Sequence, residues 1–131
     1  MIRQRKGGVG VIKLIGTAYK RDDFTKQGFF DYWFDVHAPI SAQLPGLRGY
    51  VVSEVVKKIG GELETEAFVE QWYDDEAAWD RASATEQAAA AWEDVGRYAK
   101  TTGTFWVVKE HVIVPPPDRG PGLASTWEKA E

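Results

Sequence analysis

Cysteine is absent from the 131-residue sequence, methionine occurs once and histidine only twice. The absence of cysteine excludes disulfide bonds, thiolate nucleophiles and zinc or iron–sulfur centres held by thiolates. His37 and His111 also lack the close spacing that metal-binding histidines show in a single motif, so the sequence predicts no metal site. The fold must therefore be stabilised by packing alone.

An excess of positive charge is also missing. The chain has 16 Lys and Arg against 20 Asp and Glu, a net charge of -4, which would not attract nucleic acid or an anionic membrane surface. The basic residues at the start, Arg3, Arg5 and Lys6, are typical of a solvated tail. No apolar run has the length of an export signal or a membrane span, so we expect a cytoplasmic protein with no nucleic-acid or membrane partner.

Phosphate-binding glycine patterns are absent as well. The pairs at 7–8 and 60–61 have neither the lysine of a P-loop nor the spacing of a dinucleotide fingerprint. The sequence therefore predicts no nucleotide cofactor. A haem-binding interpretation would need an axial ligand that the sequence does not identify, so we expect no cofactor.

Aromatic residues, by contrast, are abundant, with six Trp, five Tyr and six Phe. A chain of this length folds as one domain with a real core. So much aromatic surface must be buried in that core, in a pocket or at a subunit interface.

Hydrophobic periodicity and turn signals predict four strands and two helical regions. The strands are expected at 9–20, 49–59, 67–73 and 104–114, and the helices at 25–44 and 77–100, the second restarting at a capping box over 83–86. The order β-α-β-β-α-β predicts an α+β, ferredoxin-like fold: a four-stranded antiparallel sheet with both helices on one face.

Such a sheet leaves its other face bare. Alternation predicts that this face carries apolar side chains, namely Val11, Ile15, Val52, Val56, Phe105 and Val107. A second subunit that packs sheet against sheet would cover them, so we expect a homodimer.

His37 lies within the apolar stripe of the first helix. At 100° per residue it shares that stripe with Phe30, Trp33, Ile40 and Leu44. Burial disfavours the imidazolium, so its pKa should lie below about 6.5 unless an acid such as Glu110 is within bonding distance. The ring is either a core histidine bonded to a backbone carbonyl or a neutral base.

Pro39 favours the second interpretation. It lacks the amide that would bond to the carbonyl of Asp35, so it opens or kinks the helix beside His37. A kinked helix end can line a cavity.

The segment YWFDVHAPISAQLPGLRGY resembles the YW-x-x-VHAP…LPGL-x-GY signature of EthD-type proteins, which belong to the dimeric α/β-barrel (ferredoxin-like) superfamily. The later segments EQWYDDEAAWDRASATEQAAAAWEDVGRYA and WVVKEHVIV are similar to further blocks of that family. The resemblance covers about 11–114, which leaves a flexible N-terminal extension at 1–10 and a Pro/Gly-rich tail at 115–131.

The resemblance implies a dimer that closes a barrel through its sheets, a pocket between sheet and helices, and chemistry at His37. It implies no single reaction, because EthD-type proteins accompany degradative or polyketide-modifying pathways. Related barrels include isomerases, cyclases and cofactor-independent monooxygenases, and fold does not choose among them.

We therefore expect an enzyme that acts by cofactor-free proton transfer on an apolar carbonyl compound, such as a lactone or polyketide-like ring. An isomerase, cyclase or lyase is favoured over a monooxygenase. His37 would be the catalytic base or acid and Tyr50 a hydrogen-bond donor to the substrate oxygen, although Tyr50 could instead be a core or interface aromatic. The expected substrate-binding residues are Phe30, Trp33, Trp72 and Glu110.

Two alternatives remain open at this stage. Glu110 could orient a histidine, or it could form a salt bridge with Lys or Arg at the dimer seam, while His111 is expected at an edge or interface. The protein as a whole could also be a non-catalytic carrier that holds a hydrophobic intermediate for a partner oxygenase.

Overall fold

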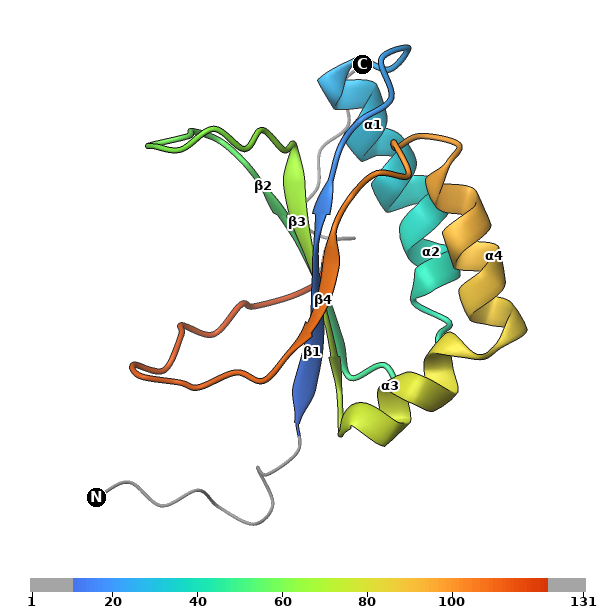
Figure 1. The fold of residues 1–131 in the computed structure, drawn as a ribbon, viewed down its shortest axis with the longest axis vertical. Coiled ribbons are helices and arrows are strands. Elements are labelled where there is room, and N and C mark those ends of the chain that lie inside the picture. The colour runs from blue at the N-terminus through green and yellow to red at the C-terminus, as the bar shows by residue number, and fades with distance from the viewer. Residues whose placement is uncertain (1–10, 123–131) are drawn as a thin grey trace.

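The computed structural model describes residues 11–122 and contains one four-stranded sheet with helices on one side (Figure 1). The elements in chain order are β1 (Ile12–Ala18), α1 (Lys26–Tyr32), a π-helical segment η2 (Trp33–His37), α2 (Ala38–Ser41), β2 (Gly49–Glu54), β3 (Ala67–Tyr73), α3 (Glu76–Ser83), α4 (Glu86–Val95) and β4 (Phe105–Val108). The predicted extension at 1–10 and the end of the predicted tail, 123–131, lie outside the described residues.

The strands lie in the order β2-β3-β1-β4, and every neighbouring pair is antiparallel. This is the arrangement of a ferredoxin-like fold, so the predicted topology is confirmed. The two edge strands are shorter than predicted, because β2 ends at Glu54 and β4 at Val108. Beyond those residues the chain leaves the sheet as two arms, 55–66 and 109–122, on the side opposite the helices (Figure 1).

The first helical region is not the single helix that periodicity predicts. Thr25 caps α1 by accepting a hydrogen bond from the amide of Gly28. At η2 the amide of Ala38 bonds to the carbonyl of Trp33, five residues back. Pro39 has no amide to donate, and the wide turn just before it accommodates that loss. The predicted disturbance beside His37 is thus a π-helical turn.

The second helical region is interrupted, as predicted. The predicted capping box begins at Ser83, whereas the residue that caps the new helix is Thr85. Asp75 caps α3 and Thr85 caps α4, each accepting a bond from an amide three residues on. Ser83 is the last residue of α3. The kink between the helices turns α4 along the sheet (Figure 1).

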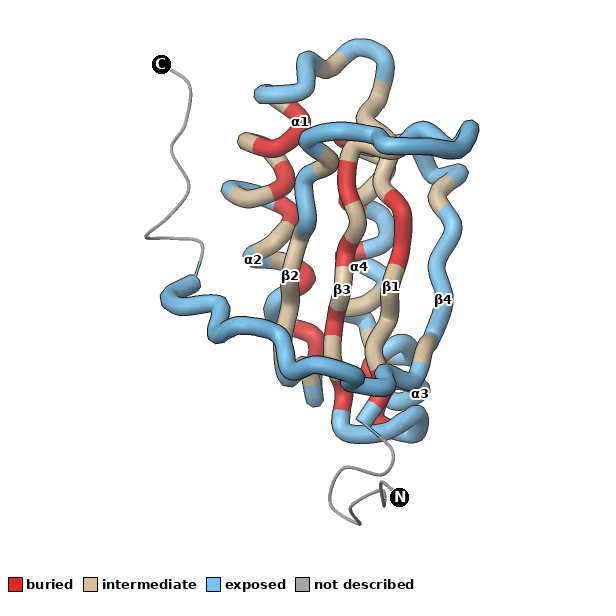
Figure 2. Tube along the Cα trace, turned by 90° about the vertical axis from the view of Figure 1, so that its left-hand side faces the viewer, coloured by how far each residue is buried: buried red, intermediate tan, exposed pale blue. Residues whose placement is uncertain are grey.

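The core lies between the sheet and the helices. Its main cluster joins aromatic side chains of the first helical region and the end of the second to the centre of the sheet, and consists of Phe29, Phe30, Trp33, Ala67, Val69, Tyr98 and Ala99. Buried positions run along β3 and β1, whereas β4 is mostly exposed (Figure 2).

The predicted apolar outer face is wrong for three residues. Val52 packs against the main core cluster, Phe105 makes an edge contact with Trp92 of α4, and Val107 shares the face of Phe105 by strand alternation. All three lie on the helix-covered side. The opposite side, here called the outer face, carries Lys13, Ile15, Phe68, Glu70, Trp72 and Trp106.

Candidate functional site

A cavity of about 630 Å³ lies between the sheet and the helices. Its walls are mostly apolar and come from all four strands as well as from α3 and α4. The principal apolar contributors are Leu14, Leu44, Val69, Trp79, Trp92 and Phe105. A cavity of this size suits a small molecule of the size of a drug or metabolite.

His37 brings a titratable ring to the cavity wall. It is the last residue of η2 and only 6% exposed. Its Nδ1 lies 2.9 Å from Oδ2 of Asp94, and its Nε2 lies 3.0 Å from Oγ of Ser41. Ser41 also lines the cavity, so both partners of the hydrogen bond at Nε2 belong to the cavity wall.

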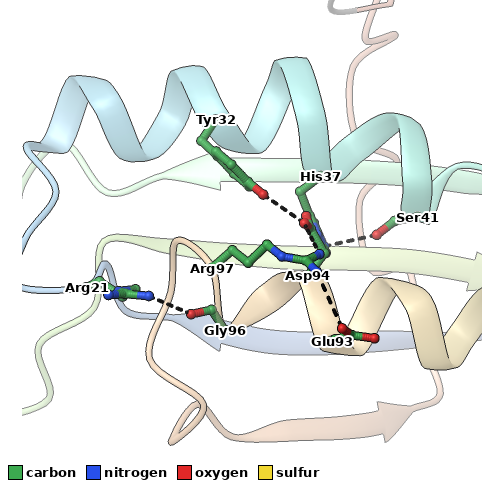
Figure 3. A network of polar contacts seen from close by, with 8 residues as sticks. All are labelled: Arg21, Tyr32, His37, Ser41, Glu93, Asp94, Gly96 and Arg97. Carbon is green, nitrogen blue, oxygen red and sulfur yellow. Dashed lines mark hydrogen bonds and ion pairs between the residues drawn. The ribbon is translucent and has the colours of Figure 1, made fainter.

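Asp94 is the anion of the site. It projects from α4, is 1% exposed, and receives Tyr32 Oη at 2.7 Å and Arg97 Nη1 at 3.1 Å in addition to His37 (Figure 3). Burial alone would raise the pKa of Asp94, but the hydrogen bonds from Tyr32, His37 and Arg97 outweigh burial and hold it below the usual range. The carboxylate is therefore ionised at neutral pH.

The charge of Asp94 fixes the protonation of His37. An ionised carboxylate only accepts hydrogen bonds, so Nδ1 carries the ring proton and Nε2 is left to accept from Ser41. Burial lowers the pKa of His37, and this outweighs the opposing effect of Asp94. The sequence-based prediction of a lowered pKa excepted a ring with an acid within bonding distance; such an acid is present, and burial still lowers the pKa. The acid is Asp94, not Glu110.

Tyr50 extends the polar part of the wall. Its hydroxyl accepts a 2.9 Å hydrogen bond from Nε1 of Trp33, and both residues line the cavity. Burial raises the pKa of Tyr50, and this outweighs the hydrogen bonds with Trp33 and Ser41, which act to lower it. Tyr50 therefore remains a protonated donor at neutral pH, close to the serine that bonds His37.

Comparison with known proteins identifies the family. The family model described as the EthD domain matches residues 21–102. The chain belongs to the EthD family. A crystal structure of an ethyl tert-butyl ether D (EthD) family protein from Bacillus halodurans is 30% identical, has a TM-score of 0.66, and aligns over 77% of this chain and 99% of its own.

More distant structures share the fold of this EthD-family chain. The cofactor-independent oxygenase SnoaB from Streptomyces nogalater is 12% identical with a TM-score of 0.55, covering 81% of this chain and 100% of its own. A dimeric protein of unknown function from Bacteroides fragilis, with a ferredoxin-like fold, is 12% identical with a TM-score of 0.56, covering 77% and 97%. A search of curated proteins gave no match.

The structure brings three of the six predicted site residues of this EthD-family protein together at the cavity: Trp33, His37 and Tyr50. Phe30 lies in the core and stacks on Trp33, with ring centroids 6.3 Å apart. It supports the wall without forming it.

Trp72 and Glu110 do not reach the cavity. Alternation along β3 turns Gln71 inward and Trp72 outward, where Lys13 lies 5.4 Å from the Trp72 ring centroid. Glu110 follows β4 and accepts a 2.9 Å ion pair from Lys13. The salt-bridge interpretation of Glu110 is therefore correct, with a partner in the same chain.

Sequence reasoning missed Asp94 and Gln71. On α4, Asp94 lies three residues after the buried Ala91, so the two share one face of the helix. A carboxylate on that apolar face was the available signal. Within residues 11–122, no three acidic or histidine side chains are grouped so as to hold a metal ion. No helix in that range is both long and apolar enough to span a bilayer.

Proposed function

We propose that this EthD-family protein is an enzyme that transfers a proton on a small, largely apolar carbonyl compound without a cofactor. The observation that carries the proposal is His37: a buried, neutral imidazole, oriented by an ionised Asp94, at the wall of an apolar cavity. A lactone or a polyketide-like ring is the substrate class that fits such walls.

In the proposed mechanism the substrate displaces the Ser41 hydroxyl from Nε2 of His37. Nε2 then removes a proton from the carbon next to the carbonyl, and the Asp94 carboxylate stabilises the imidazolium that forms. Tyr50 donates a hydrogen bond to the enolate oxygen. Return of the proton to another atom completes an isomerisation, and closure or elimination from the enolate gives a cyclase or a lyase.

The fold is compatible with such chemistry. SnoaB, which shares it, is described as a cofactor-independent oxygenase. We favour proton transfer over oxygenation for this chain, because Asp94, His37 and Ser41 form a hydrogen-bonded series with the imidazole at its centre.

The test is hydrogen–deuterium exchange at the carbon next to the carbonyl in a panel of lactones and cyclic diketones. A positioned base contributes about 10²–10⁴ in rate, so His37→Gln should lower the exchange rate by at least about 10². His111→Gln is the matched control, because His111 is exposed on an arm and lies beside the second, smaller pocket. Equal exchange by His37→Gln and the wild-type protein would contradict the proposal.

The carrier alternative has its own support. The side chains of Asp94, His37 and Ser41 already hydrogen-bond to one another, and the rest of the cavity wall is mainly apolar. Such a wall suits the binding of an apolar ligand without a reaction. A carrier would raise the melting temperature with ligand but give no deuterium exchange, whereas the enzyme should show both.

We also infer that a second copy of the chain covers the outer face, which would close the α/β barrel. The two arms flank that face (Figure 2), and their apolar side chains are left in solvent: Ile59 is 94% and Ile113 90% exposed. Such side chains at the ends of extended arms suit contact with a partner. Sedimentation should show a dimer at micromolar concentration, and a monomer there would contradict this inference.

A further inference from the structure

Gln71 is a buried polar residue that the mechanism above does not use. It lies in β3, is 6% exposed and lines the cavity. Its register partner on β2 is Tyr50. Directly paired residues of an antiparallel sheet have Cβ atoms about 5 Å apart, so the two side chains leave the sheet next to each other, and both line the cavity.

Tyr73 determines which end of the Gln71 amide faces the cavity. The Tyr73 side chain is fully buried, and its hydroxyl donates to Oε1 of Gln71 at 3.1 Å. Burial raises the pKa of Tyr73 to about 12, so the hydroxyl keeps its proton and needs an acceptor. Oε1 provides it, which directs the two N–H bonds of Nε2 away from Tyr73.

The Nε2 donors have no hydrogen-bond partner among residues 11–122. In the same part of the chain, no buried side-chain nitrogen or oxygen lacks a partner. Nε2 must therefore have accessible surface, and Gln71 lies on the cavity wall. The amide presents free donors to whatever occupies the cavity.

Tyr50 has a proton to give as well. Its oxygen already accepts from Trp33 Nε1, so its own O–H is free to point toward a ligand or toward Ser41. Trp33 also fixes the position of this hydroxyl.

We propose that Gln71 Nε2 and Tyr50 Oη form a two-donor site for one substrate oxygen, with His37 as the neighbouring base. This deepens the proposed function and rests on it. Two preorganised donors in an apolar cavity stabilise an oxygen that becomes negative far more than one that stays neutral. The substrate class is thus a carbonyl compound that passes through an enolate or enolised phenolate, with its apolar ring against the aromatic walls.

The test uses 4-nitrophenol as a probe, because its absorbance distinguishes the bound phenolate from the bound phenol. Gln71→Leu removes the donors at nearly constant volume and should weaken 4-nitrophenolate binding by about 10- to 100-fold, the range for a hydrogen bond to a charged group. Nitrobenzene has a similar shape without the phenol oxygen, so it should bind the wild-type protein and the variant equally.

A second variant guards against a folding defect, because Gln71→Leu leaves the Tyr73 hydroxyl without its acceptor. The double variant Gln71→Leu/Tyr73→Phe removes both groups and should bind nitrobenzene normally and 4-nitrophenolate weakly. Tyr73→Phe alone keeps the amide donors but frees their orientation, and should lose less phenolate affinity than Gln71→Leu.

Phenolate affinity unchanged in both Gln71 variants would overturn the two-donor site. The outcome is separable from that of the proposed function, because 4-nitrophenolate binding needs no catalysis. Suppose that His37→Gln leaves deuterium exchange intact while Gln71→Leu weakens the binding of 4-nitrophenolate. The assignment of His37 as the base would then be wrong, and the two-donor site would be supported.

Discussion

The two faces of the sheet use their polar residues differently. On β3 the inward side chains include Gln71 and Tyr73, which bond to each other beneath the helices. The outward ones include Glu70, which pairs with Lys13 at 2.5 Å. The inner face holds neutral donors and the His37 ring beside a cavity, and the outer face holds an ion pair next to the half-buried Trp72.

The two faces also differ in how they affect the pKa values of their ionisable groups. Burial acts to lower the pKa of Lys13, but hydrogen bonds and attraction to Glu70 and Glu110 raise it overall, so Lys13 keeps its charge at neutral pH. On the inner face Asp94 is held ionised while His37 is held neutral. The inner arrangement thus holds a neutral base next to a fixed anion.

The largest expected effect comes from neutralising the inner anion. Asp94→Asn keeps the shape of the side chain but leaves Tyr32 and His37 without a charged acceptor, and removing one partner of a buried ionic network costs about 3–5 kcal/mol. Urea denaturation should show that loss of unfolding free energy. Glu93→Gln is the control, because Glu93 is exposed and pairs with the same Arg97 at 3.4 Å; a comparable loss there would mean that burial is irrelevant.

A smaller effect is expected from crowding the inner face. A Cβ on Gly16 would lie 2.2 Å from the ring of Phe105, so Gly16→Ala should displace that ring from the cavity wall and cost about 1–3 kcal/mol. Gly60→Ala, where no atom lies within 4 Å of the added Cβ, should leave the melting temperature nearly unchanged. Equal melting temperatures for the two variants would show that Phe105 does not pack on Gly16.

Acidification should reduce stability through His37. Its pKa in the folded protein lies below the unfolded value of 6.5, so the folded state binds the proton less readily than the unfolded state. The unfolding free energy therefore falls as pH drops below 6.5, by at most about 2 kcal/mol at pH 5 at 1.4 kcal/mol per pKa unit. His37→Gln should flatten this part of the profile, and an unchanged slope in that variant would assign the titration to another group.

The outer face should give the smallest effect on the fold itself. Trp106 is 48% exposed, so Trp106→Ser should change the unfolding free energy of the monomer by less than about 0.5 kcal/mol. If a second copy covers this face, the same substitution should shift the sedimentation profile toward monomer. A large loss of monomer stability would instead place Trp106 in the core.

Much of the fold could be predicted from the sequence because its signals are local. The apolar spacing around His37, Pro39 and the turn at 45–46 define the first helical region, and alternation defines β3 to the residue. The face assignment of β4 failed for a physical reason: in TFWVVKEHVIV both alternating sets contain apolar residues, so the pattern does not say which set faces the helices.

The site was only half predictable. His37 and Tyr50 lie in one short segment, whereas Asp94 is 57 residues from His37 and meets it only because α4 packs beside η2. Glu110 was the wrong acid, since the end of its strand carries it to Lys13 on the other face. Gln71 is a polar residue in the inward-facing set of β3, but that alternation does not reveal its role, because the role depends on the hydroxyl of Tyr73.

Nitrogen-15 NMR of the His37 ring tests the central claim most directly. At pH 7 we expect a neutral ring that is protonated at Nδ1 and unprotonated at Nε2, with a pKa below 6.5. Asp94→Asn should change this signal, while His111→Gln should not. A doubly protonated His37 ring at pH 7, with a pKa clearly above 6.5, would contradict the neutral base and indicate an imidazolium paired with Asp94.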